Sequence, residues 1–366
     1  MESQTEHGEA FTPIKTERLL LRRPTMADLD ALVTRRSEPQ VAEYQSWSAP
    51  FPRSEAETLL AGAFEMPGPQ NEEWWMATVA GLVGGEVPSE IQDQVLGDLA
   101  VRLSEEGNVA EIGYTFSSRY WGRGYATEAV EAMVAHLFQS IGVGRVAASL
   151  DVENVASAQV LERTGFLYEG RTRHSYWPAH SELTESEPSD DLLYGMTKAD
   201  WVAWRERPSN RPAEVRLIDI TAENQRAVSE LQTHKSQERF VATVANSYGN
   251  ALFPAVIDGV ALTPTPQAIE ADGVLVGFIM TIGPTPRFPQ PHLWRLLIDR
   301  VHQRRGIGAR AIECLVEQLR AEGQQSLSVS WSEGRGSPGA FYRGLGFEPT
   351  GQGLAGEIEA KRSLAL

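Results

Sequence analysis

The stretch Arg300–Leu319, RVHQRRGIGARAIECLVEQL, decides how the second half of this chain folds. Its apolar residues recur at spacings of one and three, which is one face of an α-helix. These residues are Ala311, Ile312, Leu315, Val316 and Leu319. Before the helix, Gly306 and Gly308 let backbone N–H groups approach a ligand closely. The helix dipole favours an anion there, and Arg304, Arg305 and Arg310 add positive charge. The stretch therefore predicts a phosphate-binding turn.

The first half repeats this pattern. A glycine turn, Trp121–Thr127, leads into a helix with the same apolar spacing. In each half a strand follows, at Arg145–Leu150 and Ser326–Trp331, and then a short helix that ends in Gly-Phe, LERTGF (161–166) and FYRGLGF (341–347). Gly124 and Gly165 are 41 positions apart, and Gly306 and Gly346 are 40 apart. Two copies at one spacing predict two domains of the same fold.

Alternating and helical patterns complete each copy. We predict a disordered tail at residues 1–13, a first domain at 14–204, a linker at 205–213 and a second domain at 214–366. Further strands are expected at Thr16–Arg23, Trp74–Val79, Val95–Leu103, Ala110–Phe116, Tyr168–Tyr176, Leu192–Met196, Val215–Ile220 and Trp294–Ile298, with paired strands around Ile269–Thr281. Helices are expected at Pro24–Arg36 and near Glu223–Gln232.

Composition narrows the function. The chain has 366 residues, 42% of them hydrophobic, with no apolar run long enough to span a membrane and no secretion signal at its start, so we expect a cytoplasmic protein. A net charge of -16 argues against nucleic acid and anionic membrane surfaces. It favours a cationic partner, or serves solubility alone. One cysteine and no paired histidine motif predict no disulfide and no metal site.

Three kinds of phosphate site compete as explanations of the two glycine turns. A nucleotide P-loop needs Gly-Lys-Ser/Thr, which neither turn has. GIGARA fits a dinucleotide fingerprint, but that fingerprint opens its βαβ unit, whereas each turn here comes late in its half. The third pattern matches residue by residue. Gln303–Gly308 carries the Q/R-x-x-G-x-G/A signature of GNAT acetyltransferases, which this half resembles. The first half resembles the RimJ/RimL branch, with TERLLLRR, YWGRGYATEA and LERTGF. The second resembles diamine or polyamine acetyltransferases, with LWRLLID, QRRGIG and FYRGLGF.

The resemblance implies an α/β fold in each half, a mixed, mostly antiparallel twisted sheet flanked by helices with a splayed central strand pair. It implies acetyl-coenzyme A as cofactor, with the pyrophosphate on the N–H groups of the two turns and the pantetheine arm along the preceding strands. The residues expected to bind it are Leu297, Ile298, Gln303, Arg304, Arg305, Gly306, Ile307, Gly308, Ala309 and Arg310, and in the first half Tyr114, Phe116, Trp121, Gly122, Arg123, Gly124, Tyr125, Ala126, Thr127 and Asn154.

An amine attacking a thioester must first lose a proton, since an alkylammonium has a pKa of about 10, and the leaving thiolate must then gain one. The resemblance assigns the acid to Tyr342, which could instead only pack its helix on the sheet. In the first half Leu161 stands in that position, so Ser157 is the candidate acid and Glu111 a candidate base acting through water. Glu111 could equally be an exposed strand residue. Arg335 replaces the Asn expected in the second half.

We therefore expect an acyltransferase, a tandem N-acetyltransferase whose substrate is a small cationic amine such as a polyamine, an amino-group antibiotic or an amino metabolite. The acidic stretch Ser181–Asp191, which we expect to be a loop and which the resemblance places beside the substrate cleft, supports this, although such runs are often solvated surface. Protein N-terminal acetylation by the first half is one alternative. A second is that one half only binds cofactor or has a structural role. The chain is expected to be a monomer or a homodimer.

Overall fold

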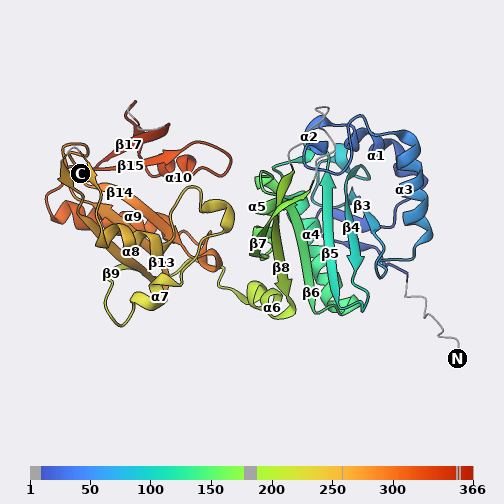
Figure 1. Cartoon of the computed structure of the whole chain (residues 1–366), viewed down its shortest axis with the longest axis horizontal. Helices are drawn as coiled ribbons and strands as arrows, with labels where there is room; N and C mark the ends of the chain where they lie inside the picture. The colour runs from blue at the N-terminus through green and yellow to red at the C-terminus, as the bar shows by residue number, and fades with distance from the viewer. Residues whose placement is uncertain (1–9, 177–187, 258, 352, 354–355, 366) are drawn as a thin grey trace. The chain divides into compact units, whose positions relative to one another are not determined.

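A computed structural model gives the structure of the protein and describes residues 10–176, 188–257, 259–351, 353 and 356–365. The chain divides into two compact units, Met1–Arg205 and Glu206–Leu366. In Figure 1 the first runs from blue to green and the second from yellow-green to red. Within the described residues, no helix is both long and apolar enough to cross a membrane.

The first unit is built on one eight-stranded sheet in the order β1-β2-β3-β4-β5-β6-β8-β7. All of its neighbouring strands pair antiparallel except β5 and β6. The strands are β1 (Ile14–Lys15), β2 (Leu19–Arg22), β3 (Trp75–Gly81), β4 (Val95–Leu103), β5 (Val109–Phe116), β6 (Arg145–Asp151), β7 (Leu167–Tyr176) and β8 (Ser189–Thr197). The helices are α1 (Leu29–Arg36), α2 (Pro39–Ala42), α3 (Arg53–Glu65), α4 (Tyr125–His136), α5 (Val155–Arg163) and α6 (Lys198–Glu206).

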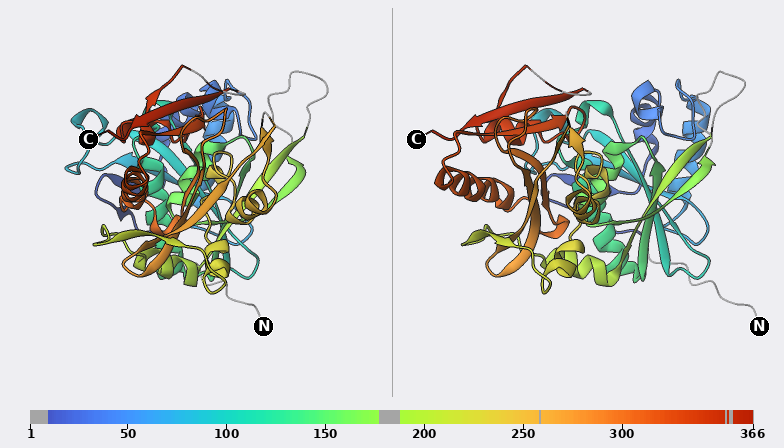
Figure 2. Two further views of the ribbon diagram at one scale, coloured as in Figure 1. Left: turned by 90° about the vertical axis from the view of Figure 1, so that its left-hand side faces the viewer. Right: turned by 60° about the vertical axis from the view of Figure 1, so that its left-hand side comes forward.

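Both faces of this sheet are covered because neighbouring strand residues point to opposite sides. Trp75 packs in the core that α4 closes, whereas the next residue, Met76, packs with α1 and α3. The right-hand view of Figure 2 shows α1 and α3, in blue, on one side of the sheet and the green helices on the other. The apolar stripe predicted for α4 is buried, so the turn at its start is fixed against the sheet.

The second unit repeats the plan with a seven-stranded sheet in the order β16-β17-β15-β14-β13-β12-β9. Its strands are β9 (Val215–Asp219), β12 (Pro264–Ala271), β13 (Val274–Ile282), β14 (His292–Ile298), β15 (Ser326–Ser332), β16 (Glu348–Pro349) and β17 (Glu357–Ser363). A separate hairpin contains β10 (Val256–Ile257) and β11 (Val260–Ala261). The helices are α7 (Gln225–Ser229), α8 (Val244–Leu252), α9 (Ile307–Ala321) and α10 (Gly339–Gly344).

One pair of parallel strands separates in each sheet. β14 and β15 pair only through His292 with Ser328 and Leu293 with Val329. Just beyond this point the register of β14 against β13 skips Trp294, which forms a β-bulge. In the first unit β5 and β6 pair only as far as Glu111 with Ala147. The rest of each strand edge is therefore free to bind something other than its neighbour.

The predicted fold class is confirmed, and three local predictions are corrected. Phe11 belongs to no disordered tail, because it is buried with its ring centroid 4.7 Å from that of Trp75. The helix expected at Glu223–Gln232 is only the short α7. The helix α8 was not predicted from the sequence. Of the acidic stretch, residues 181–187 lie outside the described residues, whereas Ser189–Asp191 form the start of β8 rather than a loop.

Candidate active sites

The glycine turn of the second unit has a backbone shape suited to an anion. Gly306 and Arg304 both have left-handed backbones, with φ of 76° and 61°, and α9 begins at Ile307. Left-handed residues next to right-handed ones turn successive N–H groups toward one point, and the first N–H groups of a helix have no intrahelical acceptor. A side chain on Gly306 would find nothing closer than the Arg211 Nε, at 3.9 Å. The turn is therefore open to a phosphate group.

The turn of the first unit has the same geometry. Gly122 and Gly124 have φ of 75° and 82°, and α4 begins at Tyr125. In each turn the side chain at the first signature position donates to the last carbonyl of the preceding strand. Trp121 Nε1 donates to Phe116 O at 2.8 Å, and Gln303 Nε2 donates to Ile298 O at 3.0 Å. These two side chains, both predicted to bind the cofactor, close the turn in the same way.

Two arginines predicted to add charge to the second turn have other partners. Arg305 Nε donates to Asn210 O at 2.7 Å. Arg310 donates through both terminal nitrogens to the carbonyls of Pro212 and Ala213, at 2.7 and 3.0 Å. Their guanidinium groups thus fix the segment before β9 against α9, and the charge that they were predicted to add to the turn comes from groups already bonded to backbone carbonyls. Arg304 is the arginine of this group that lines the open side of the turn.

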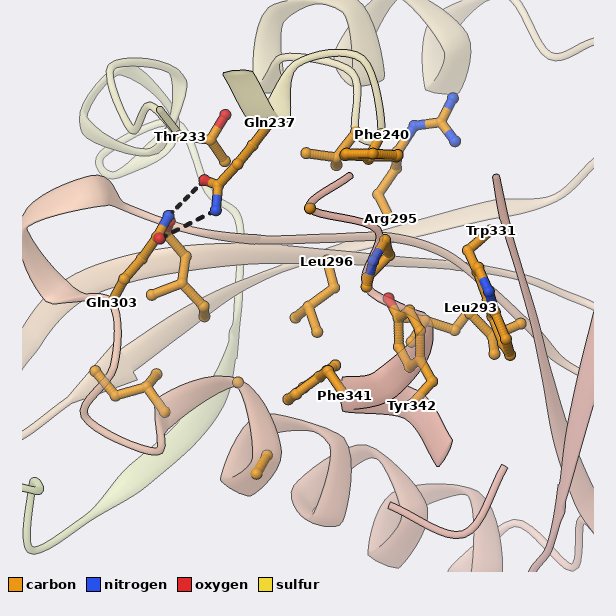
Figure 3. Close-up of a pocket in the computed structure, with 18 of the residues that line it drawn as sticks. Thr233, Gln237, Phe240, Leu293, Arg295, Leu296, Gln303, Trp331, Phe341 and Tyr342 are labelled. Carbon is orange, nitrogen blue, oxygen red and sulfur yellow. Dashed lines mark hydrogen bonds between the residues drawn. The ribbon is translucent and has the colours of Figure 1, made fainter. Parts of the chain in front are cut away.

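A cavity of about 500 Å³ lies beside this turn in the second unit. It is lined by most of the cofactor-binding residues predicted there, together with Tyr342 (Figure 3). Those lining residues are Ile298, Gln303, Arg304, Gly306, Ile307, Gly308 and Ala309. Leu297 is not among them, because it points to the opposite face of β14 and packs there with Phe278. The splayed strands thus connect the turn and Tyr342 through one space.

Tyr342 is held rigidly by its aromatic neighbours. Its ring is stacked on Trp331, with centroids 5.6 Å apart and planes at 23°, and meets Phe347 edge-on at 5.7 Å. The ring is 7% exposed, and Figure 3 shows its hydroxyl directed into the cavity. Burial raises the pKa of Tyr342 well above its ordinary value, so the hydroxyl keeps its proton at neutral pH. The site therefore offers a fixed proton donor.

A polarised chain of side chains ends at the inner part of the cavity. Ser330 lines the cavity, and its Oγ lies 3.2 Å from His292 Nε2. His292 Nδ1 lies 2.9 Å from Ser328 Oγ, which in turn donates to Pro291 O at 3.4 Å. Because the Ser328 hydroxyl donates to Pro291 O, its oxygen accepts from His292 Nδ1–H. His292 Nε2 then carries no proton and accepts from the Ser330 hydroxyl. Burial, with Arg287 and Arg295 nearby, lowers the pKa of His292 to about 4. The ring is neutral at pH 7.

Arg295 lines the same part of the cavity. Its guanidinium donates to Trp294 O at 2.9 Å and lies over the Trp294 ring, 4.5 Å from the centroid. Its Nε is buried without a hydrogen-bond partner. Burial lowers the pKa of Arg295, although Glu357 opposes this at longer range. A cationic group with spare donors thus lies where β14 and β15 begin to separate.

The first unit brings its candidate residues together around Tyr114. The Tyr114 hydroxyl lies 2.8 Å from Ser157 Oγ and donates to Ser157 O at 3.0 Å. Asn154 caps α5, because its side chain accepts from Ser157 N at 3.1 Å. Burial raises the pKa of Tyr114 above its ordinary value. Tyr114 was predicted only to lie beside the cofactor, and the sequence does not show that its hydroxyl lies close to Ser157.

Glu111, the candidate base, is ion-paired. Its Oε2 accepts from Arg102 at 2.6 Å, and its side chain is 33% exposed. It stands at the last paired position before β5 and β6 separate, the position that Leu293 occupies at the start of the second splay. The structure therefore brings Glu111 to the splay, but with its carboxylate engaged by a neighbouring strand.

Carboxylates gather where β6 ends and β8 begins in the first unit. Asp151 and Asp191 are cross-strand partners. Burial and then the charges of Asp151 and Asp190 raise the pKa of Asp191, although Ser175 donates to it. Burial and Glu43 raise the pKa of Tyr44, and the charges of Asp151 and Glu153 raise it further, so Tyr44 lies near this end of the sheet. This end of the first unit is strongly acidic, unlike the second cavity.

Sequence reasoning missed His292, Ser330 and Arg295. A signal for Ser330 existed, since serines alternate with apolar residues in SLSVSWS and so share one face of that strand. Only the pairing of β14 with β15 brings His292 to that face. No group of three or more His, Cys, Asp or Glu side chains arranged to hold a metal occurs in the part of the chain that the structure describes.

The comparisons with known proteins agree with this architecture. Residues 18–167 match the family profile described as Acetyltransferase (GNAT) domain, and residues 237–347 match the one described as Acetyltransferase (GNAT) family. An uncharacterized N-acetyltransferase, p20, of Bacillus licheniformis is 29% identical over 189 residues, 51% of this chain and 96% of that protein.

The ribosomal-protein-serine acetyltransferase of Escherichia coli is 32% identical over 80 residues, 22% of this chain and 45% of that protein. Among solved structures, spermidine N-acetyltransferase from Vibrio cholerae in complex with CoA and spermine is 15% identical, with a TM-score of 0.42 over 51% of this chain and 99% of that one. An acetyltransferase of the same family from Bacillus anthracis is 22% identical, with a TM-score of 0.43 over 51% of this chain and 98% of that one.

Proposed function

Because the chain belongs to the GNAT acetyltransferase family, with one domain in each half, we propose that the second domain transfers an acetyl group to a primary amine by direct attack in a ternary complex. The protein is an acyltransferase that uses acetyl-coenzyme A. The observation that carries the proposal is a single cavity lined both by the phosphate-binding turn and by Tyr342.

Residues of this chain suit both the pyrophosphate and the pantetheine arm of the cofactor. The N–H groups of Arg305–Gly308 would hold the pyrophosphate at the start of α9, with Arg304 adding charge. The edge of β14 near Ile298, which β15 leaves free, would pair with the pantetheine arm. In the first domain the same parts would be Arg123–Ala126 and the edge of β5 from Tyr114 to Phe116. When bound, acetyl-coenzyme A supplies the activated acetyl thioester.

Tyr342 is the proposed acid for the leaving thiolate. Supporting this, burial keeps the phenol protonated at neutral pH, and the rings of Trp331 and Phe347 fix its direction. The same exclusion of water disfavours a free thiolate, so the thiolate also becomes a stronger base. Proton transfer from the Tyr342 hydroxyl to the thiolate is therefore less unfavourable than the pKa values of the two groups in water suggest. A positioned donor of this kind contributes about 10²- to 10⁴-fold to the rate.

For the first domain we propose a small cationic amine as the acceptor, with Ser157 as the acid and Glu111 as a base acting through water. The supporting observation is the acidic end of β6 and β8, where Asp151 and Asp191 are cross-strand partners, whereas Asp190 is ion-paired with Arg171 at 2.5 Å. A polyamine, an amino-group antibiotic or an amino metabolite would satisfy that charge. Coulomb attraction to the carboxylates of Asp151 and Asp191 favours a polycation over a neutral amine.

Protein N-terminal acetylation is the second candidate for the first domain. A ribosomal-protein-serine acetyltransferase is among the proteins similar to this chain. A protein acceptor would need the same amine chemistry but would present a peptide to the acidic end of the sheet. Acetylation of peptides without acetylation of free amines would favour this candidate.

The test is acetyl transfer by the full chain, with a panel of amines and peptides, in Tyr342→Phe and Ser157→Ala variants. We expect each variant to lose the activity of its own domain by about 10²-fold or more. Tyr248→Phe and Ser54→Ala, which change residues outside both sites, serve as matched controls. Loss in only one variant assigns the working domain, with the other acting as a binding or structural module. Unchanged turnover in both would refute the assignment of both acids.

A further inference from the structure

The cavity of the second domain differs in charge from what a polycationic acceptor requires. Among the described residues that line it, none is an aspartate or a glutamate, whereas Arg295, Arg304 and His302 are basic residues. Arg304 belongs to the phosphate-binding turn, and His302 precedes it. Arg295 stands apart from both. A diamine entering this space would meet no carboxylate to balance its second charge.

Arg295 lies on the part of β14 that lines the cavity away from the phosphate turn, together with Leu293 and Trp294. Arg295 is three positions before Ile298, about 10 Å at the rise of a strand. It directly follows the bulge at Trp294, which comes after the two residues through which β14 still pairs with β15. Ser330 and Phe240 line the cavity near it, and Figure 3 shows the Arg295 guanidinium beside the Phe240 ring. We take this part of the cavity, away from the phosphate-binding turn, as the place where the acceptor amine would bind.

The guanidinium of Arg295 has unused hydrogen-bonding capacity. It makes no ion pair within 4 Å in the part of the chain that the structure describes, its Nε is without a partner, and one terminal nitrogen donates to the carbonyl of Trp294. By contrast, Arg287 nearby is paired with Glu359 at 3.2 Å. A partly buried guanidinium is costly to leave uncompensated, and a carboxylate is the group that its planar donors match best.

We propose that the acceptor of the second domain is an amine that also carries a carboxylate, as an amino acid does, and that Arg295 binds this carboxylate and so determines specificity. The inference rests on the proposed acetyl transfer at Tyr342. It gives the two domains acceptors of different charge, a cationic amine at the acidic end of the first and an amino-carboxylate at the basic end of the second.

Matched pairs of amines test this, because L-lysine and cadaverine, or L-ornithine and putrescine, differ only in a carboxylate. The rate that belongs to the second domain is the part that Tyr342→Phe removes from the full chain. For that part we expect kcat/KM to be about 10- to 100-fold higher for the amino acid of each pair, as one charge-assisted pair provides. Arg295→Gln should lower kcat/KM more for the amino acid than for the diamine of each pair and so abolish this preference, and Arg295→Lys should restore part of it.

Arg343→Gln is the matched control, because Arg343 is exposed and already paired with Glu333 at 3.0 Å. Coenzyme A affinity is measured in every variant. A Tyr342-dependent rate that favours the diamines overturns the inference and leaves the proposed function standing. Equal loss for both members of each pair in Arg295→Gln, or weaker coenzyme A binding, would likewise overturn it, since Arg295 would then be structural or a phosphate ligand. No Tyr342-dependent transfer to any amine refutes the proposed function, and the inference with it.

Discussion

His292 should make the second domain sensitive to acid. The imidazole is 3% exposed, and its pKa is lowered to about 4 by burial and by Arg287 and Arg295. In the unfolded chain the same group takes up a proton at a pKa of about 6.5. The native state therefore holds fewer protons than the unfolded state below pH 6.5, and stability falls as the pH drops toward 4. The difference of about 2.5 pKa units corresponds to about 3 kcal/mol.

The measurement compares His292→Gln with the wild-type chain. Urea unfolding, followed by tryptophan fluorescence and far-UV circular dichroism at pH 7 and pH 4, gives the free energy of unfolding at each pH. Glutamine can still bond to Ser328 and Ser330 but does not titrate, so the variant should lose about 3 kcal/mol less than wild type between the two pH values. An identical pH dependence in His292→Gln and wild type would refute the reasoning.

Three further substitutions test the geometry of the sites. Gly306→Ala forces a side chain into a left-handed backbone, at a cost of about 1–2 kcal/mol, and should weaken coenzyme A binding to the second domain. The helical Gly344→Ala should leave that binding unchanged. Equal affinity of the two variants for coenzyme A, measured by calorimetry, would contradict this prediction. Asp98→Asn leaves the buried Arg35 unpaired and should cost about 3–5 kcal/mol in urea unfolding of the first domain, so a cost below 1 kcal/mol would count against the pair. Asn154→Ala removes the cap of α5 and should cost about 1 kcal/mol, while Asn154→Asp, which keeps the acceptor, should cost less.

The sequence was informative where a local pattern has one structural solution. The spacing after Gly306 predicted α9, and the repeat of turn, strand and Gly-Phe helix predicted two related sheets. The resemblance carried by FYRGLGF identified Tyr342, which lines the cavity with the turn. These features depend on residues close to one another in the chain, so their consequences can be read without knowing the rest of the fold.

Features that depend on distant pairing could not be predicted in this way. Whether His292 meets Ser330 is decided by the register of β14 against β15. The guanidinium of Arg310 was expected to add charge to the turn, but its bonds to carbonyls of the segment before β9 could not be foreseen, because only the tertiary fold brings that segment to α9. The charge of the second cavity likewise differs from the acidity of the whole chain, because net charge says nothing about which residues line one space.

The central claim, that each half holds an acetyl-coenzyme A site built on its glycine turn, is tested most directly by calorimetric titration of the full chain with coenzyme A. The two open turns, with Gly124 before α4 and Gly306 before α9, predict two molecules bound per chain. Gly306→Ala should weaken one of the two binding events and leave the other unchanged. Binding of a single molecule that this substitution does not affect would contradict the account of the second domain.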